Sequence, residues 1–384
     1  MNTAPLEGIR ILDLSRLTPG AYATLLAADL GADVVKVEQP VTGDYLRTLV
    51  PAGFSYLCRN KRSVTIDLKS GSGKDVFYKL CESADVILES FRPGVCARLG
   101  LDYETVSHIN PRLIVCSLSG FGQTGPYRNK SGHDLNYLGV AGALSLMGEP
   151  SGPPAHSTGI AVADFNASMF TVLSIVAAVL ARERTGRGQY VDVSMTDCMA
   201  SWMGRYLAER VSDESRTREA MMSRPGYDVY QCSDGTYVTL GCVEDVFWQN
   251  LISTLPVGHE LQNFRSPDSR DANREKIEEL LANLIAQESR DHWLDVFKAS
   301  DVPAAPVNMF EEMLGDPQLR ARALFIENPD EPGAPYQRFP VVFSDVSSRE
   351  PVRAPELGAH TDEVLREAGF EQSVIDELRK EGAV

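Results

Sequence analysis

The chain has 384 residues, 43% of them hydrophobic and 23% charged, an ordinary globular composition with length enough for about two to three domains. Its 37 Lys and Arg against 53 Asp and Glu give a net charge of −16, which disfavours nonspecific binding to nucleic acid or to an anionic membrane. The seven cysteines form no CxxC pair and the N-terminus has no apolar signal core. We therefore expect a cytoplasmic protein with reduced thiols that is neither exported nor inserted in a membrane.

The first half of the chain alternates apolar strand patterns with helical patterns. Residues 9–14 are typical of a buried strand, residues 19–28 of a helix and residues 33–38 of the next strand. Further strand patterns follow at 85–91 and 113–119. This alternation predicts an α/β fold with a mostly parallel sheet that is covered on both faces.

Two nucleotide-binding signatures in this half are incomplete. The turn after the first strand, SRLTPG, lacks a GxGxxG pattern, which argues against a nicotinamide or flavin site. The segment KSGSGKD resembles a P-loop, but Leu68 stands five residues before Gly73, and Asp75 replaces the Ser or Thr expected after Lys74. We therefore exclude ATP and GTP binding through this loop.

A basic cluster precedes the strand pattern at residues 63–67. Arg59, Lys61 and Arg62 stand together in RNKR, and Lys69 follows the strand. Such a cluster can hold phosphate groups. Charge runs usually face water, however, so a solvated surface turn is the alternative interpretation.

A glycine-rich loop leaves the strand pattern at 113–119. Its glycines at 120, 122 and 125 let the backbone turn sharply and approach a ligand closely. His133 and Asp134 stand at the far edge of this loop. Because ligands of α/β folds bind at the carboxyl ends of strands, this pair is a candidate for a reaction site.

A long apolar helix is predicted from residue 160 to 183, with Asp164 near its start. A carboxylate in the first turn of a helix is favoured by the helix dipole, so an N-terminal charge or cap is the simpler interpretation of Asp164. A strand pattern at 190–195 follows the helix.

The composition changes after about residue 210, where a polar linker begins. A hairpin signal at 233–235, Glu244 just after it and two amphipathic helical patterns between 270 and 300 predict a small α+β domain over residues 211–329. The tail, residues 330–384, returns to a strand-like pattern at 339–343 and ends in an amphipathic helix. We expect this tail to complete the large domain of residues 1–210.

Several blocks of the sequence resemble one known family. RILDLSRLTPG, GADVVKVEQP with GDYLR, NKRSVTIDLK, ESFRPG, SGFGQTGPY, GHDLNY, ERTGRGQYVDVS and APELGAHT occur in the order found in the class III CoA transferase and α-methylacyl-CoA racemase superfamily. This resemblance implies a large Rossmann-like domain, a smaller domain and a homodimer of two interlocked rings. It also implies an acyl-CoA substrate, with coenzyme A as part of that substrate, no permanently bound cofactor and no metal.

The resemblance assigns candidate binding residues as well. The phosphates of coenzyme A need fixed cations and helix ends on a protein of net negative charge. Gln39 stands where the family often has an Arg, so one phosphate contact differs. The implied nucleotide-end residues are Ile66, Asp67, Lys69 and Arg98, with Lys61, Arg62 and Arg92 added on electrostatic grounds and Gly132, Asp134 and Tyr137 on the thioester side.

The family uses two chemistries, which differ at a few positions. Racemases place an acid and a base on opposite faces of the thioester α-carbon. The matching residues here are His133 and Asp164, with Glu244 supporting the histidine. In transferases an Asp matching Asp164 attacks the acyl-CoA, and an acyl anhydride and an aspartyl-CoA thioester follow.

Some residues around these positions favour the racemase chemistry and others the transferase chemistry. His133 in GHDLNY and Glu244 favour the racemase chemistry, so we expect His133 and Asp164 to face each other across a pocket with Glu244 in reach of the histidine. The sequence FNASM after Asp164 resembles the transferases instead, and Asn166 and Ser168 within it would narrow or polarise the pocket. Asp134 is expected to place the loop or to cap the helix that follows it.

Overall fold

The computed structural model describes residues 4–384 except 215, 257, 329–330, 332 and 347–348. The chain divides into two compact units. The first contains the residues up to Ala143 together with Thr158–Met203 and Ala321–Val384, and the second contains Leu144–Ser157 and Gly204–Arg320.

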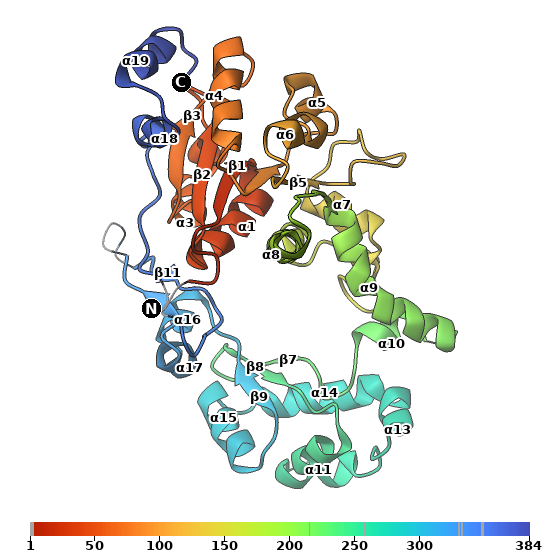
Figure 1. The fold of residues 1–384 in the computed structure, drawn as a ribbon. Helices are drawn as coiled ribbons and strands as arrows, with labels where there is room; N and C mark the ends of the chain where they lie inside the picture. The colour runs from red at the N-terminus through yellow and green to blue at the C-terminus, as the bar shows by residue number, and fades with distance from the viewer. Residues whose placement is uncertain (1–3, 215, 257, 329–330, 332, 347–348) are drawn as a thin grey trace. The chain divides into compact units, whose positions relative to one another are not determined.

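A six-stranded parallel sheet forms the centre of the first unit, in the order β3-β2-β1-β4-β5-β6. The chain runs outward from β1 to β3 and then resumes on the other side of β1 with β4 (Figure 1). In open α/β sheets the crevice at such a reversal is the usual ligand site. The parallel sheet confirms the α/β prediction, and its strands are β1 (Arg10–Leu14), β2 (Asp33–Glu38), β3 (Arg62–Thr65), β4 (Val86–Glu89), β5 (Ile114–Ser119) and β6 (Tyr190–Ser194).

Helices connect these strands and cover the sheet. The incomplete P-loop segment is the start of one of them, where the Ser70 hydroxyl caps α4 by accepting a hydrogen bond from Gly73 N at 2.9 Å. The helices are α1 (Leu17–Asp29), α2 (Leu46–Leu49), α3 (Pro51–Leu57), α4 (Gly71–Cys81), α5 (Val95–Leu99), α6 (Tyr103–Ile109), α7 (Asp134–Val140), α8 (Val162–Thr185), α9 (Met195–Ser212), α18 (Thr361–Glu367) and α19 (Gln372–Lys380), with a 3-10 turn η1 (Ala143–Leu146).

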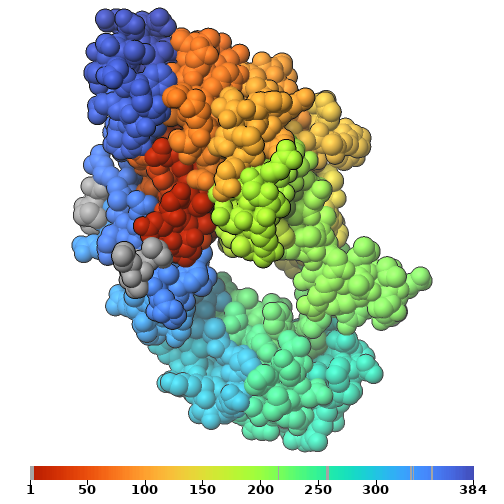
Figure 2. Space-filling view, viewed as in Figure 1, coloured from red at the N-terminus to blue at the C-terminus, as the bar shows by residue number. Residues whose placement is uncertain are grey.

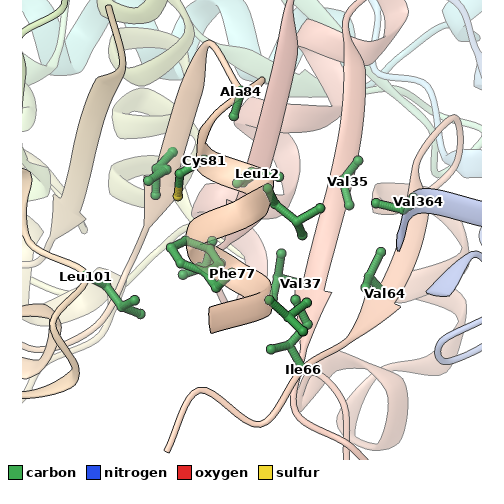
Figure 3. Packing of buried hydrophobic residues seen from close by; sticks show 14 of the residues in the cluster. Leu12, Val35, Val37, Val64, Ile66, Phe77, Cys81, Ala84, Leu101 and Val364 are labelled. Atoms are coloured by element: carbon green, nitrogen blue, oxygen red, sulfur yellow. The ribbon is translucent and has the colours of Figure 1, made fainter. Parts of the chain in front are cut away.

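The main core lies between one face of the sheet and the helices α4, α6, α18 and α19. Phe77 of α4 packs among strand side chains such as Leu12 and Val37 (Figure 3). Val364 of α18 and Ile375 of α19 are fully buried in the same cluster. Each such side chain contributes about 1.5–3 kcal/mol when it is removed from water. The C-terminal helices therefore belong to the fold of the first unit.

The predicted strand at residues 339–343 is wrong. Among the described residues nearby, two short strands form, β10 (Phe325–Ile326) and β11 (Tyr336–Gln337), which pair antiparallel. Residues 339–343 have no regular structure, and Val341 and Val342 are exposed. Pro340 lies inside the pattern and has no N–H group to donate to a strand ladder.

Helix α8 combines a buried face with an exposed apolar stripe. Met169, Leu173, Val176 and Leu180 recur at helical spacing and are all more than a third exposed. Figure 2 shows α8 in yellow-green at the surface of the first unit. Its length and apolar composition are also those of a membrane span, a property that core helices of soluble proteins share.

The second unit is built on an antiparallel sheet, β7 (Val229–Gln231), β8 (Tyr237–Leu240) and β9 (Ala304–Pro306). The predicted hairpin between β7 and β8 is confirmed, with Gly235 at φ 80°. Trp248 and Phe297 are fully buried in its core. Its helices are α10 (Arg218–Met222), α11 (Asp245–Thr254), α12 (Gly258–Leu261), α13 (Pro267–Ala272), α14 (Arg274–Ile285), α15 (Arg290–Ala299), α16 (Phe310–Gly315) and most of α17 (Pro317–Ala321).

Candidate active site

A cavity of about 840 Å³ opens at the carboxyl ends of the central strands of the first unit. Residues that follow β1, β2, β4 and β5 line it, together with the far end of the glycine-rich loop and the start of α8. This is the reversal point of the strand order, where ligands of such sheets bind. A cavity of this volume is typical of binding sites for organic ligands and cofactors.

Tyr137 of α7 fastens both ends of the glycine-rich loop. A Cβ atom at Gly120 would lie 2.4 Å from the Tyr137 ring, so only glycine allows this contact. The Tyr137 hydroxyl donates a hydrogen bond to Gly132 O at 2.6 Å. Thr196 of α9 holds the Gly120 end of the loop, because its Oγ1 donates to Gly120 O at 2.7 Å. The loop is therefore a braced wall of the cavity, and the sequence-predicted residues Gly132 and Tyr137 both line it.

His133 stands at the N-cap of α7 with extended backbone angles, φ −132° and ψ 178°. Its backbone N donates to Asn136 Oδ1 at 3.0 Å, and its backbone O accepts from Asn136 N at 2.8 Å. The exposed side chain of His133 lines the cavity. The local fold thus presents this imidazole to a ligand.

Asp134 caps a different helix from the one that the sequence suggested. Its Oδ1 accepts hydrogen bonds from Ala163 N at 2.7 Å and from Asp164 N at 3.1 Å. These are backbone donors of the first turn of α8, which have no partner within the helix. Asp134 therefore joins the starts of α7 and α8 and does not line the cavity, so it is removed from the candidate coenzyme A contacts.

Asp164 reaches the cavity through this arrangement. Burial, and then the negative charge of Asp134, raise the pKa of the Asp164 carboxyl to about 7. A carboxyl group with such a pKa is divided between its acid and base forms near neutral pH, which suits proton transfer. Burial, and then the Asp164 charge, raise the pKa of the nearby Tyr137 to about 12, so this phenol keeps its proton.

Asn166 and Ser168 do not narrow or polarise the cavity, contrary to expectation. Both are buried and face neighbouring helices. With its amide oriented to satisfy both atoms, Asn166 accepts from Trp202 Nε1 at 2.9 Å. The Ser168 hydroxyl donates to Pro19 O at 2.7 Å. These two residues hold α8 against α9 and α1, which fixes the helix that carries Asp164.

A cationic arm of the cavity is formed by Lys69, Arg92 and Arg98. The salt bridges found among the described residues involve none of these three side chains, so their charges are available to an anion. Ile66 and Asp67 line the cavity beside Lys69, as predicted, and so does Gln39. This arm can hold the phosphate groups of a nucleotide.

Four further cations that sequence reasoning missed line the cavity, Arg16, Lys36, Arg128 and Lys130, of which Lys36 is bound to Asp44 at 2.8 Å. The Arg16 guanidinium lies over the rings of Tyr45 and Phe91, at 5.2 and 5.4 Å from their centroids. Arg16 is isolated in the sequence, and its only signal was its place two residues after the end of the first strand. Arg128 and Lys130 belong to the glycine-rich loop, whose basic residues were a usable signal.

Lys61 and Arg62 were wrongly placed among the phosphate-binding candidates. Lys61 is buried, and its Nζ donates to Thr24 Oγ1 at 2.7 Å and lies 3.4 Å from Asp13. Arg62 forms salt bridges with Asp33 and with Glu363 and Glu367 of α18, the carboxylates that attach the C-terminal tail. Neither side chain lines the cavity. Carboxylates of the same unit already pair with both charges, so the interpretation of the RNKR cluster as a solvated surface turn is wrong as well.

Glu244 belongs to the second unit, where it is the exposed N-cap residue of α11. Its predicted support of His133 stays a prediction.

Comparisons with known proteins agree with one another over nearly the whole chain. The sequence model of CoA-transferase family III matches residues 6–361. The chain is 33% identical to a succinate–glutarate CoA-transferase of Agrobacterium fabrum, covering 94% of this chain and 95% of that one. It is 34% identical to an alpha-methylacyl-CoA racemase of Mus musculus, covering 99% and 97%. A crystal structure of a CaiB/BaiF family protein from Brucella suis superposes with a TM-score of 0.85 at 34% identity, covering 95% and 100%.

Proposed function

The chain belongs to CoA-transferase family III, whose members process acyl-CoA thioesters, and from this premise we propose that it epimerises a 2-methylacyl-CoA by proton transfer at the α-carbon. Racemases and transferases resemble the chain at the same level of identity, so the choice between them depends on the site. The observation that carries the proposal is that His133 and Asp164 line one cavity together with the cationic arm.

The chemistry needs two groups that exchange a proton. One group removes the α-proton, and the electron pair of the C–H bond moves into the thioester carbonyl to give an enolate. The other group then returns a proton to the opposite face of the α-carbon. An imidazole is the commonest proton-transfer group in enzymes, and an Asp164 whose pKa is about 7 can act in either direction near neutral pH.

The cationic arm fits the remainder of such a substrate. Coenzyme A carries a 3′-phosphate and a pyrophosphate, which require fixed positive charge on a protein with a net charge of −16. Lys69, Arg92 and Arg98 are proposed to bind these phosphates at one end of the cavity, with the thioester at the His133 and Asp164 end. Binding energy at the phosphates would then hold the α-carbon in place for the reaction.

Coenzyme A transfer is the second candidate, favoured by the transferase-like sequence after Asp164 and by the transferase relatives. In that reaction the Asp164 carboxylate attacks the thioester carbonyl and the CoA thiolate leaves, which forms a mixed anhydride. The thiolate then attacks the Asp164 carbonyl carbon and releases the first carboxylic acid, which leaves an aspartyl-CoA thioester. The thioester passes coenzyme A to a second acid. His133 would have no required role in these steps.

One experiment separates the two candidates. The protein is incubated with one epimer of a 2-methylacyl-CoA in deuterium oxide, with no second carboxylic acid present. We expect deuterium at the α-carbon and conversion to the other epimer. Absence of α-exchange, together with movement of coenzyme A to an added acid and a hydroxylamine-sensitive adduct on Asp164, would overturn the proposal in favour of transfer.

We further propose that the protein is a cytoplasmic homodimer. The apolar stripe of α8, Met169, Leu173, Val176 and Leu180, is of the kind that a second copy of the chain would cover. Light scattering should report twice the chain mass of 42.1 kDa. Charged substitutions at Leu173 and Leu180 should shift that mass towards the monomer, and a monomeric wild type would contradict the proposal.

A further inference from the structure

The turn that joins β1 to α1 is fixed at its backbone by side chains from the two segments that flank β1. Lys36 of β2 donates from Nζ to Ser15 O at 3.0 Å. Ser90, directly after β4, accepts a hydrogen bond from Arg16 N at 2.8 Å through its hydroxyl oxygen. The same hydroxyl donates to Arg16 O at 3.4 Å. One side chain therefore binds both backbone groups of Arg16.

The backbone of this turn is strained at the residue that follows Arg16. Leu17 has φ 64°, in the left-handed region that residues with a Cβ atom rarely adopt. Its N–H donates to Asp44 Oδ1 at 3.4 Å, and the Asp44 carboxylate lies 2.8 Å from Lys36 Nζ. Strained conformations persist only where the surrounding structure over-determines them, and they cluster at functional sites. The contacts of Lys36, Asp44 and Ser90 supply that support, so the fold imposes the conformation of the turn.

The imposed conformation presents the Arg16 guanidinium to the cavity. The guanidinium lies over the rings of Tyr45 and Phe91, which belong to the segments that follow β2 and β4. The faces of aromatic rings attract a guanidinium without neutralising its charge. The salt bridges found in the described part of the chain do not involve Arg16. Its positive charge is therefore held in place and available to an anion.

The strand order places Arg16 between the two ends of the cavity. β1 is two strands away from β3, which precedes Lys69, and two strands away from β5, which leads into the glycine-rich loop and His133. Because adjacent strands lie about 4.8 Å apart, β1 is about 10 Å from each of these strands. In coenzyme A the pyrophosphate lies between the 3′-phosphate of the ribose and the thioester. Arg16 therefore stands where the pyrophosphate would cross the cavity.

We propose that Arg16 binds the pyrophosphate of coenzyme A and that Ser90 is the residue that positions Arg16 for this contact. A guanidinium presents pairs of N–H donors that match the oxygens of a phosphate group. The inference rests on the proposed function only through the coenzyme A thioester, which both candidate chemistries use. Its test therefore measures the binding of coenzyme A and does not depend on which reaction follows.

Isothermal titration calorimetry of the full-length protein with coenzyme A and with 3′-dephospho-coenzyme A tests the assignment of Arg16. We expect R16A to weaken the binding of both compounds about tenfold, the size of one charge-assisted phosphate contact. The two factors should be equal, because both compounds carry the pyrophosphate. R16Q keeps much of the side-chain length without its charge and should behave in the same way. R184A is the matched control, because Arg184 is an exposed residue of α8 outside the cavity, and it should bind both compounds like the wild type.

The role of Ser90 is tested by a double-mutant cycle. S90A removes the hydroxyl group that holds the Arg16 backbone and should weaken the binding of coenzyme A about threefold, as the loss of a neutral hydrogen bond does. S90T keeps a hydroxyl group and should bind like the wild type. The double variant R16A/S90A should bind no more weakly than R16A, because Ser90 acts through Arg16. S107A removes a hydroxyl group of α6 outside the cavity and should have no effect.

Each outcome bears on a different part of the inference. Wild-type affinity of R16A for coenzyme A would overturn it. A loss confined to coenzyme A, with the binding of the dephospho compound unchanged, would place the 3′-phosphate and not the pyrophosphate at Arg16. Multiplying effects of R16A and S90A would show that Ser90 does not act through Arg16.

Two further results separate this inference from the proposed function. If R16A does not fold, R16Q decides by the same two binding factors. A wild type that binds no coenzyme A would refute the proposed function and this inference together. A wild type that binds coenzyme A but exchanges no α-proton would refute the epimerisation alone, and the affinities of R16A and R16Q would still decide the role of Arg16.

Discussion

The basic stretch at residues 59–62 and the cationic arm formed by Lys69, Arg92 and Arg98 carry the same kind of charge but make opposite contacts. In the stretch, Arg59 pairs with Asp29 at 2.8 Å, and Lys61 and Arg62 are bound to other carboxylates of the same unit. In the arm, the three side chains line the cavity and take part in none of the salt bridges found among the described residues. A cationic side chain is therefore available to an anionic ligand only where the fold places no carboxylate beside it to pair with it.

The largest expected effect is a loss of kcat, and it comes from substitutions at the reacting end of the cavity and not in either cationic group. H133A and D164N should each lower kcat for epimerisation by about a hundred- to ten-thousandfold, because each removes one group of the acid–base pair. KM and the circular dichroism spectrum should stay close to those of the wild type. Steady-state kinetics measure this, with H156A, a histidine outside the cavity, as the matched control. A kcat of H133A within a few fold of the wild type would remove the histidine from the mechanism.

The buried lysine of the basic stretch should matter for stability. K61A removes one of the two buried lysines, Lys36 and Lys61, whose charges act on the Asp13 carboxylate, and removal of one partner of a buried pair costs about 3–5 kcal/mol. K61M keeps most of the side-chain volume but not the charge, so it should be nearly as unstable. Urea unfolding measures the loss. If K61A instead raised KM for acyl-CoA at unchanged stability, the two cationic groups would not differ as described.

The cationic arm should affect binding and leave stability alone. K69A and R98A should each raise KM for acyl-CoA about tenfold, which corresponds to one charge-assisted phosphate contact of about 1.4 kcal/mol. The effect should shrink at high salt, because a screened contact contributes less in the wild type. R62A serves as the control, since its guanidinium binds Asp33 and α18, and its KM should be unchanged. A larger KM effect in R62A than in K69A would contradict the assignment.

The smallest expected effect concerns the pH dependence set by Asp134. D134N keeps the amide oxygen that can cap α8 but removes the negative charge that helps to raise the pKa of Asp164 to about 7. The apparent pKa of Asp164 in the kcat profile should therefore fall towards the ordinary value of a carboxyl group. The raised pKa of Asp164 also makes the stability of the folded protein depend on pH. Because the folded-state pKa is raised, the folded protein binds more protons than the unfolded chain between about pH 4 and 7, so the ionised Asp164 destabilises the fold as the pH rises through this window.

Thermal unfolding at pH 4 and pH 8 measures this change in stability. D164N should be more stable than the wild type at pH 8 and no more stable at pH 4. An unchanged pH profile in D134N would show that burial alone raises the pKa.

Most of the fold could be predicted from the sequence, because the apolar strand patterns and their helical connections are local. The loop with His133 and the helix with Asp164 were found in the same way. Most of what failed depended on partners far along the chain. Arg62 meets Glu363 and Glu367 about three hundred residues later, which no local pattern reveals. The capping of α8 by Asp134 across 29 and 30 residues was likewise invisible, and Pro340 disrupted a strand pattern whose apolar residues alone were convincing.

The central claim is that His133 and Asp164 are an acid and a base on opposite faces of one α-carbon. The direct measurement is α-deuterium exchange from each pure epimer of a 2-methylacyl-CoA in deuterium oxide, catalysed by H133A and by D164N. The account predicts that neither variant epimerises, that each still exchanges one epimer through its remaining group, and that the two variants exchange opposite epimers. Loss of both exchanges in D164N, with both retained in H133A, would contradict it.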